Sequence, residues 1–198
     1  MKKNQFLQGF NQAWIGYAYS SYLVDQWDEK EVLRTFELAK KSGAKILRFW
    51  LFEGTNPGGF IWQGDRPSGL KPEYLIHLRR LIEIAHQFHI ELNLTLFDGN
   101  ISTWKASAFP SLIHKNWWYN LLNEKYNVGI DFRVKILSPL FSLLGEPIAK
   151  KTVTHIDLAN EINAMAFPIW TNGIRFNEGW DTANAFICRY HQYIKSDQ

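Results

Sequence analysis

The stretch TVTHIDLANE at residues 152–161 decides the fold. Its first eight residues predict a strand, and this strand ends at the polar pair Asn160-Glu161. A second run, KILRFWLF at residues 45–52, predicts another strand, which ends directly before Glu53. Both strands therefore carry ionisable side chains at their carboxyl ends.

Apolar runs and amphipathic stretches alternate on both sides of these two strands. Asp28 is placed to cap a first helix, Gly43 to end it, and Pro72 to begin a second helix. The Gly- and Pro-rich stretch 54–69 is predicted to be one long loop. Strands are predicted at 6–15, 45–52, 90–97 and 152–159, and helices at 28–41, 72–88, 131–144 and 177–194.

Strand and helix follow one another four times, with short connections after the helices that favour parallel neighbours. This order indicates an α/β fold, either an open doubly wound sheet or part of a barrel. In both architectures ligands bind at the carboxyl ends of the strands. The side chains expected at that edge are polar or aromatic: Asn11, Trp14, Arg48, Trp50, Glu53, Asp98, Asn100, Asn160 and Glu161.

The composition is that of one globular domain spanning 1–198, with 46% hydrophobic and 21% charged residues and no fixed-period repeat. A net charge of +3 with scattered basic residues argues against a nucleic-acid partner. The single cysteine, Cys188, cannot form an intrachain disulfide. Nine tryptophans are the compositional outlier: they suit stacking on sugars, but tryptophan is also a core residue.

The amino terminus has the charges of a signal peptide without the apolar stretch that should follow them. No segment reaches the roughly 18 uninterrupted apolar residues of a membrane helix. We therefore expect no membrane partner, and a cytoplasmic location if Met1 is the native start.

Glu161 is the candidate general acid/base. That role needs a carboxyl group with a raised pKa, and partial burial behind an apolar strand is expected to raise it. Asn160 can hold a substrate hydroxyl, and Arg48 can orient carboxylates in the same rim. Each also has a purely structural interpretation, Glu161 as a solvated loop residue or helix cap and Arg48 as the partner of Asp157. The convergence of four strand ends on one rim favours the functional interpretation.

Other catalytic motifs have little support. His86 and His89 form an H-x-x-H pair at a helix end, without the glutamate and third ligand of a zinc site. Cys188 has no catalytic motif around it. The sequence contains neither a G-x-x-x-x-G-K phosphate loop nor a G-x-S-x-G nucleophile elbow. We therefore predict no metal and no cofactor.

Three stretches resemble the clan A glycoside hydrolases, in particular the family 5 cellulases and mannanases: GFN at 9–11, GAKILRFW at 43–50 and DLANE at 157–161. In that clan an Asn-Glu pair closes the fourth strand of a (β/α)8 TIM barrel, and its glutamate is the general acid/base. The resemblance implies this role for Glu161 and identifies Arg48 with the arginine of the second strand. It also implies that the chain forms the first four strand-helix units, a half barrel.

The resemblance further implies a hydrolase of β-linked glycosidic bonds in cellulose- or mannan-type oligo- or polysaccharides. The clan's nucleophile closes the seventh strand and has no counterpart among the four predicted here; Glu53, Asp98 and Glu178 are the other candidate carboxylates. The alternative is a non-catalytic sugar-binding or assembly module, an inactive half barrel. Substrate contacts are expected from Asn11, Trp14, Arg48, Trp50, Glu53, Asp98, Asn160 and Trp170.

A half barrel leaves the edges of its first and last strands open to pairing. We therefore expect the barrel to be completed by a second copy of the chain or by a C-terminal half. In a symmetric pair, two Glu161 residues would approach one another and offer a route to a second carboxylate.

Overall fold

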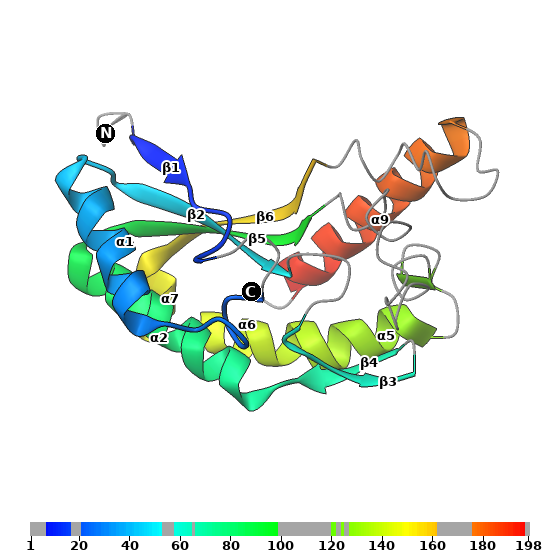
Figure 1. Ribbon diagram of the computed structural model, residues 1–198. Coiled ribbons are helices and arrows are strands. Elements are labelled where there is room, and N and C mark those ends of the chain that lie inside the picture. The colour runs from blue at the N-terminus through cyan, green and yellow to red at the C-terminus, as the bar shows by residue number, and fades with distance from the viewer. Residues whose placement is uncertain are drawn as a thin grey trace.

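A four-stranded parallel sheet forms the centre of the computed structural model, which describes residues 7–16, 21–52, 58–64, 66–98, 120–121, 124, 127–161 and 176–196. The strands are β1 (Gly9–Asn11), β2 (Ile46–Phe52), β5 (Glu91–Asp98) and β6 (Val153–Asn160). They lie side by side in the order β1-β2-β5-β6, which is also their order in the chain (Figure 1). The predicted α/β class with a parallel sheet is confirmed, although β1 is shorter than the predicted strand.

The register gives the sheet two different faces. One row across the strands is polar, namely Asn11, Arg48, Asn93 and His155. The adjacent row is apolar, namely Phe10, Leu47, Leu92 and Val153. Successive side chains of a strand point to opposite faces, so the two rows lie on opposite sides of the sheet. A bulge follows Leu92, where β6 has one residue more than β5.

Helices α1 (Glu29–Lys41) and α2 (Pro72–Phe88) begin where the sequence predicts. The Asp28 side chain accepts a hydrogen bond of 2.9 Å from the backbone N–H of Lys30 and so caps α1. Pro72 occupies the first turn of α2, and His89 ends it with a left-handed backbone, φ 55°. The buried residues of these two helices include Val32, Phe36, Ala39, Leu78, Leu81, Ile82 and Ala85.

The predicted helix over 131–144 is confirmed, with an earlier start. It consists of α5 (Val128–Phe132), the π-helical turn η3 (Arg133–Leu137) and α6 (Ser138–Leu144). A short helix that was not predicted, α7 (Pro147–Thr152), then leads directly into β6. The last helix, α9 (Phe176–Ser196), agrees with the predicted one to within two residues at each end.

The prediction of one long loop over 54–69 is wrong. Strands β3 (Phe60–Gln63) and β4 (Arg66–Leu70) pair antiparallel in a hairpin, with a bulge between Ile61 and Trp62. Phe60 is buried, and its ring centroid lies 5.0 Å from that of Phe52. A proline and a glycine inside the short β4 concealed the strand pattern, because both residues are uncommon in strands.

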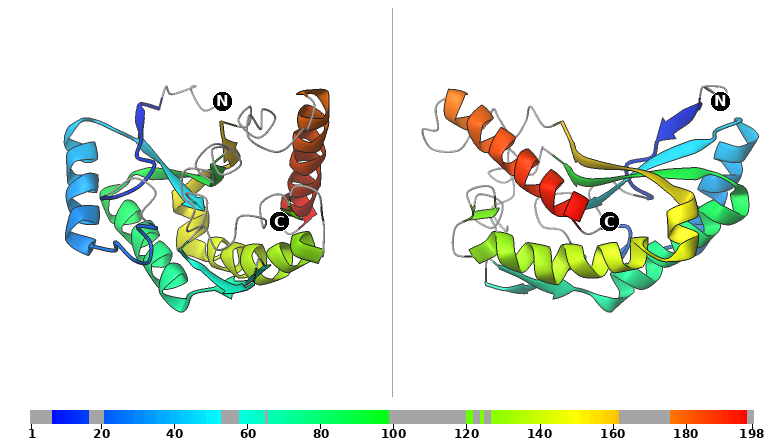
Figure 2. Two further views of the ribbon diagram at one scale, coloured as in Figure 1. Left: turned by 45° about the vertical axis from the view of Figure 1, so that its right-hand side comes forward. Right: turned by 180° about the vertical axis from the view of Figure 1, so that it is seen from behind.

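The helices form a curved layer around one side of the sheet, which Figure 2 shows for α1, α2, α6 and α9. The apolar core fills the space between this layer and the sheet. An aromatic cluster of Phe52, Phe60, Phe97, Phe132, Phe186 and Tyr190 joins the carboxyl ends of β2 and β5 to α5 and α9. No helix of the described residues covers the opposite, polar face (Figure 1). None of the described helices combines the length and apolar character that crossing a bilayer requires.

Candidate functional site

The Arg48 guanidinium joins three strands of the sheet. Its Nε donates a hydrogen bond of 2.8 Å to Asp157 Oδ2 on β6. Its Nη1 donates to Asn11 Oδ1 on β1 at 3.2 Å and to Asn160 Oδ1 on β6 at 3.1 Å. The structure therefore brings together three residues that the sequence places in the rim, namely Asn11, Arg48 and Asn160.

Asp157 is the anion that fixes this arrangement. Besides the bond from Arg48, its Oδ2 accepts hydrogen bonds from Asn93 Nδ2 at 3.1 Å and from Thr95 Oγ1 at 3.3 Å. The ion pair is partly open to solvent, since the side chains of Arg48 and Asp157 are 24% and 38% exposed. The suggestion that Arg48 pairs with Asp157 is confirmed, and the same guanidinium also reaches both asparagines.

Asn93 and Thr95 were not predicted as part of this cluster. They lie two residues apart on β5, between leucines that are completely buried. A strand that alternates Leu with Asn and Thr has one apolar and one polar face. That alternation, next to Arg48 on the neighbouring strand, could have predicted that Asn93 and Thr95 belong to the polar cluster.

Trp50 lies beside this cluster but is covered. Its ring centroid is 6.0 Å from Arg48 Cζ and 5.2 Å from that of Trp14, to which it is nearly perpendicular at 82°. Trp50 is only 6% exposed, whereas Trp14 is half-buried. The sequence suggests Trp50 or Trp170 as a stacking face for a sugar. Trp170 lies outside the described residues, and the burial of Trp50 makes Trp14 the more accessible of the two neighbouring rings.

Glu161 follows the last residue of β6 and is exposed, with a left-handed backbone, φ 48°. The predicted partial burial of Glu161 is wrong. Among the described strands β6 is an edge strand, so its carboxyl end is only partly covered. Asp98 pairs in register with Asn160 on the neighbouring strand but is completely buried. The two carboxylates at this edge thus have opposite environments.

The remaining predicted site residues cannot be placed. Glu53 and Trp170 lie outside the described residues, as does Asn100. Glu178 belongs to α9, but its side chain is outside the described part of the chain.

The histidine pair has structural contacts. His86 Nδ1 lies 3.2 Å from Thr152 Oγ1, and His89 is the C-cap of α2. Within the described residues, no group of three or more His, Cys, Asp or Glu side chains is arranged to hold a metal ion.

The fold of the chain matches solved structures of β-mannanases. It aligns with the β-mannanase of the blue mussel Mytilus edulis with a TM-score of 0.62 and 19% identity, over 81% of this chain and 42% of that one. The TM-score is 0.65 with the β-1,4-mannanase of the sea hare Aplysia kurodai, at 16% identity over 88% and 47% of the two chains. It is 0.66 with the β-1,4-D-mannanase of Cryptopygus antarcticus, at 16% identity over 95% and 54%.

These alignments confirm the resemblance to the family 5 mannanases at the level of the fold. The chain spans about half the length of the mannanase structures that it matches. No family profile and no curated protein sequence matches it.

Proposed function

We propose that the chain provides the acid/base half of a glycoside hydrolase active site, with β-linked mannan as its substrate and Glu161 as the general acid/base. The observation that carries this proposal is the Arg48 guanidinium, bonded to Asn11, Asn160 and Asp157 beside Glu161. A hydrogen-bonded polar cluster at the carboxyl edge of a parallel sheet is where α/β folds bind ligands. The solved structures compared above are β-mannanases, which supports mannan as the substrate to test first.

The described sheet is, in this proposal, the first half of a (β/α)8 barrel. The sequential parallel order β1-β2-β5-β6 supports it, because a doubly wound sheet reverses its strand order at the ligand site and a barrel does not. The alignment of the chain with about half of each mannanase structure supports it as well.

The two asparagines are oriented by Arg48. Asn11 and Asn160 each accept a hydrogen bond from Arg48 Nη1 through the side-chain oxygen. The amide NH₂ of each residue then remains to donate to sugar hydroxyls. Arg48 thereby fixes which end of each amide a substrate meets, so the donors are in place before the substrate binds.

Glu161 acts on the glycosidic oxygen. In the protonated form it donates its proton to the leaving oxygen as the bond from that oxygen to the anomeric carbon breaks. The carboxylate that forms regains a proton from a water molecule, and its exposure at the end of β6 gives water access. The neighbouring amide of Asn160 holds the sugar in place during this transfer.

The second carboxylate of the reaction has to come from elsewhere. A glycosidase of this type needs two carboxyl groups, about 5–5.5 Å apart for retention or about 6.5–9.5 Å for inversion. Asp157 is held by three donors and Asp98 is completely buried, so neither is open to a sugar carbon or an attacking water. We infer that the nucleophile or base lies on another segment or on a second chain.

The purified chain should release reducing sugar from β-1,4-mannan, and Glu161→Gln should lower the rate about 10²- to 10⁴-fold. Glu37→Gln is the matched control, since Glu37 is exposed on α1. An aryl mannoside with a strongly acidic phenol needs no protonation of its leaving group. Formation of the glycosyl intermediate or product from this substrate should therefore depend far less on Glu161.

Two outcomes would overturn the proposal. If the chain binds mannohexaose but shows no turnover above Glu161→Gln, it is a non-catalytic sugar-binding module. If it neither binds nor cleaves mannan, cellulose or aryl glycosides, the carboxyl edge has no carbohydrate function in this chain.

A further inference from the structure

We propose that two copies of the chain pair edge to edge, with β1 of each copy beside β6 of the other. The proposal concerns association and draws on the sheet edges and a hollow beside β6. Only its consequence for catalysis, a rim built from two chains, rests on the proposed function.

Both outer strands of the sheet have a free edge. Within the described residues, β1 pairs only with β2, and β6 pairs only with β5. All three residues of β1 are exposed, and so are Thr154 and His155 of β6. Parallel sheets are almost always covered on both faces, and exposed edges invite pairing with another strand.

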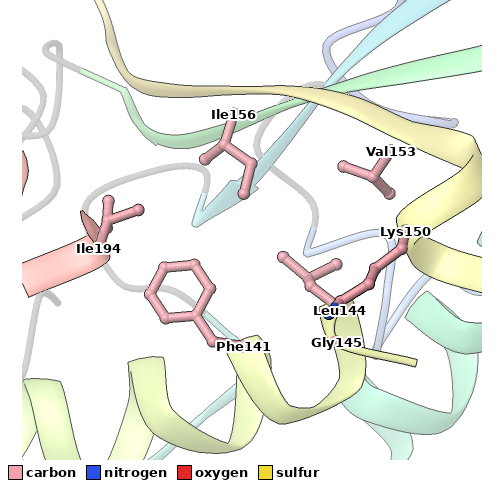
Figure 3. Close-up of a pocket in the computed structure, with 7 residues that line it drawn as sticks. All are labelled: Phe141, Leu144, Gly145, Lys150, Val153, Ile156 and Ile194. Carbon is pink, nitrogen blue, oxygen red and sulfur yellow. The ribbon is translucent and has the colours of Figure 1, made fainter. Parts of the chain in front are cut away.

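A hollow of about 460 Å³ lies alongside β6, and Lys150 and Gly145 line it together with five apolar side chains. Figure 3 shows Val153 and Ile156 of β6 pointing toward Phe141 and Leu144 of α6, with Ile194 of α9 at one side. Val153 and Ile156 pair in register with Leu92 and Leu94, so they lie on the helix-covered face of the sheet. The hollow therefore adjoins the free edge of β6 on the apolar side of the sheet.

The free edge of β1 carries an apolar side chain on the same face. Phe10 is 45% exposed and pairs in register with the buried Leu47. Phe10 and Val153 are the two ends of a single apolar row across the sheet. A β1 strand from a second copy, lying beside β6, would place its Phe10 on the side of the sheet where the hollow lies.

Both free edges can be paired at the same time in a two-fold dimer. A two-fold axis parallel to the strands keeps all strands parallel and makes the two β1–β6 junctions identical. The pair then contains eight strands, the number of a closed TIM barrel. A barrel with a shear of about 8 shifts each half by about four residues, an even number, so outward side chains remain outward.

No helix of the described residues covers the polar face of the sheet (Figure 1). In a two-fold pair this face lines the inside of the closed barrel, where the polar rows of the two copies, with Arg48 and His155, face one another. Pairing would also bring a second Glu161 to the same rim.

Size-exclusion chromatography with light scattering tests the pairing. At micromolar concentration the chain should have twice its mass of 23.2 kDa. Phe10→Asp should raise the dissociation constant at least about tenfold, because the burial of Phe10 is lost and a carboxylate would have to lose water at the junction. Ile76→Asp is the matched control, since Ile76 is a similarly exposed apolar residue on α2, at 57%, away from both edges. It should leave the mass unchanged.

Cross-linking tests the geometry of the pair. In a Cys188→Ser background, which removes the exposed native thiol, a chain with Phe10→Cys is mixed with a chain carrying Ile156→Cys. A short bis-maleimide should then link the two different chains. A monomer at micromolar concentration, a dimer indifferent to Phe10→Asp, or the absence of this cross-link would each overturn the proposal. None of these measurements involves a sugar, so they fail independently of the proposed function.

Discussion

Replacing Asp157 should weaken the fold and the rim together. Asp157 Oδ2 accepts hydrogen bonds from Arg48, Asn93 and Thr95, which come from two neighbouring strands. Alanine at this position removes all three bonds at once. It also releases the constraint that holds Arg48 Nη1 between Asn11 and Asn160.

The expected cost follows from these three contacts. A hydrogen bond to a charged group contributes about 1.5–3 kcal/mol when shielded. The Arg48–Asp157 pair is 24% and 38% exposed, so we reduce its share to about 1 kcal/mol. The bonds from Asn93 and Thr95 add about 0.5–1 kcal/mol each, and Thr95 is completely buried, so its hydroxyl would lose its acceptor in a dry place. The total for Asp157→Ala is about 2–3 kcal/mol.

Urea unfolding monitored by tryptophan fluorescence and circular dichroism gives the free energy of unfolding of each variant. For a chain of this size, about 2–3 kcal/mol corresponds to a fall in Tm of about 4–12 °C. Asp157→Asn keeps one acceptor oxygen and loses the charge, so about 1 kcal/mol is expected. The control is Glu31→Ala, whose ion pair with Arg34 at 3.6 Å is exposed on both sides and should contribute less than about 0.5 kcal/mol.

Two results would refute these roles of Asp157. If Asp157→Ala costs no more than the Glu31 control, the three bonds do not hold the strands together. If it destabilises the chain as calculated but leaves mannohexaose affinity unchanged at a temperature where the variant is folded, Asp157 stabilises the sheet without orienting the rim.

Two further predictions concern the helix layer. Burial alone would raise the pKa of Asp131, but hydrogen bonds from Arg66 and Lys135 outweigh it and lower the pKa below 3.8. The ionised carboxylate therefore stabilises the folded chain above about pH 4. This stabilisation is lost as the pH falls through the folded-state pKa of Asp131. Urea unfolding across this range should show a smaller loss in Arg66→Met than in the native chain, and equal losses would contradict the assignment. Tyr190→Phe should change the free energy of unfolding by less than about 1 kcal/mol, because the buried Tyr190 hydroxyl makes no hydrogen bond of regular geometry within the described residues and interacts only weakly with the nearby Arg133 guanidinium. Tyr22→Phe, equally buried, removes a 3.0 Å bond to the Trp50 carbonyl and should cost about 1 kcal/mol, and a larger loss for Tyr190→Phe than for this control would refute the reasoning.

Most of the helix and strand order could be predicted because local signals agreed with the tertiary structure. Asp28 caps α1 and Pro72 begins α2, and both residues act within one turn of the chain. The hairpin of β3 and β4 could not be predicted in the same way. Its stability comes from Phe60 packing on Phe132 and from Arg66 bonded to Asp131, contacts with helix α5, which is distant in the sequence.

The site could be predicted only as a set of strand ends. The register was sufficient to bring Asn11, Arg48 and Asn160 together, since parallel strands in sequential order place their carboxyl ends at one edge. Exposure was not predictable, because it depends on what covers each strand. Trp50 is central in the sheet and buried, whereas Glu161 ends an edge strand and is exposed.

The exposure of Glu161 links the catalytic question to the question of association. A general acid near neutral pH needs its pKa raised, and burial is the usual means. Glu161 lies at the end of β6, the strand whose outer edge is free within the described residues. A strand paired to that edge would cover the end of β6 and partly bury the carboxyl group. The Glu161 carboxyl group should therefore be less accessible to solvent in the paired chain than in the Phe10→Asp monomer. Coupling of this carboxyl group to an amine with a water-soluble carbodiimide, followed by mass spectrometry, measures the difference. Equal coupling rates in both forms would refute the link between pairing and the cover of Glu161.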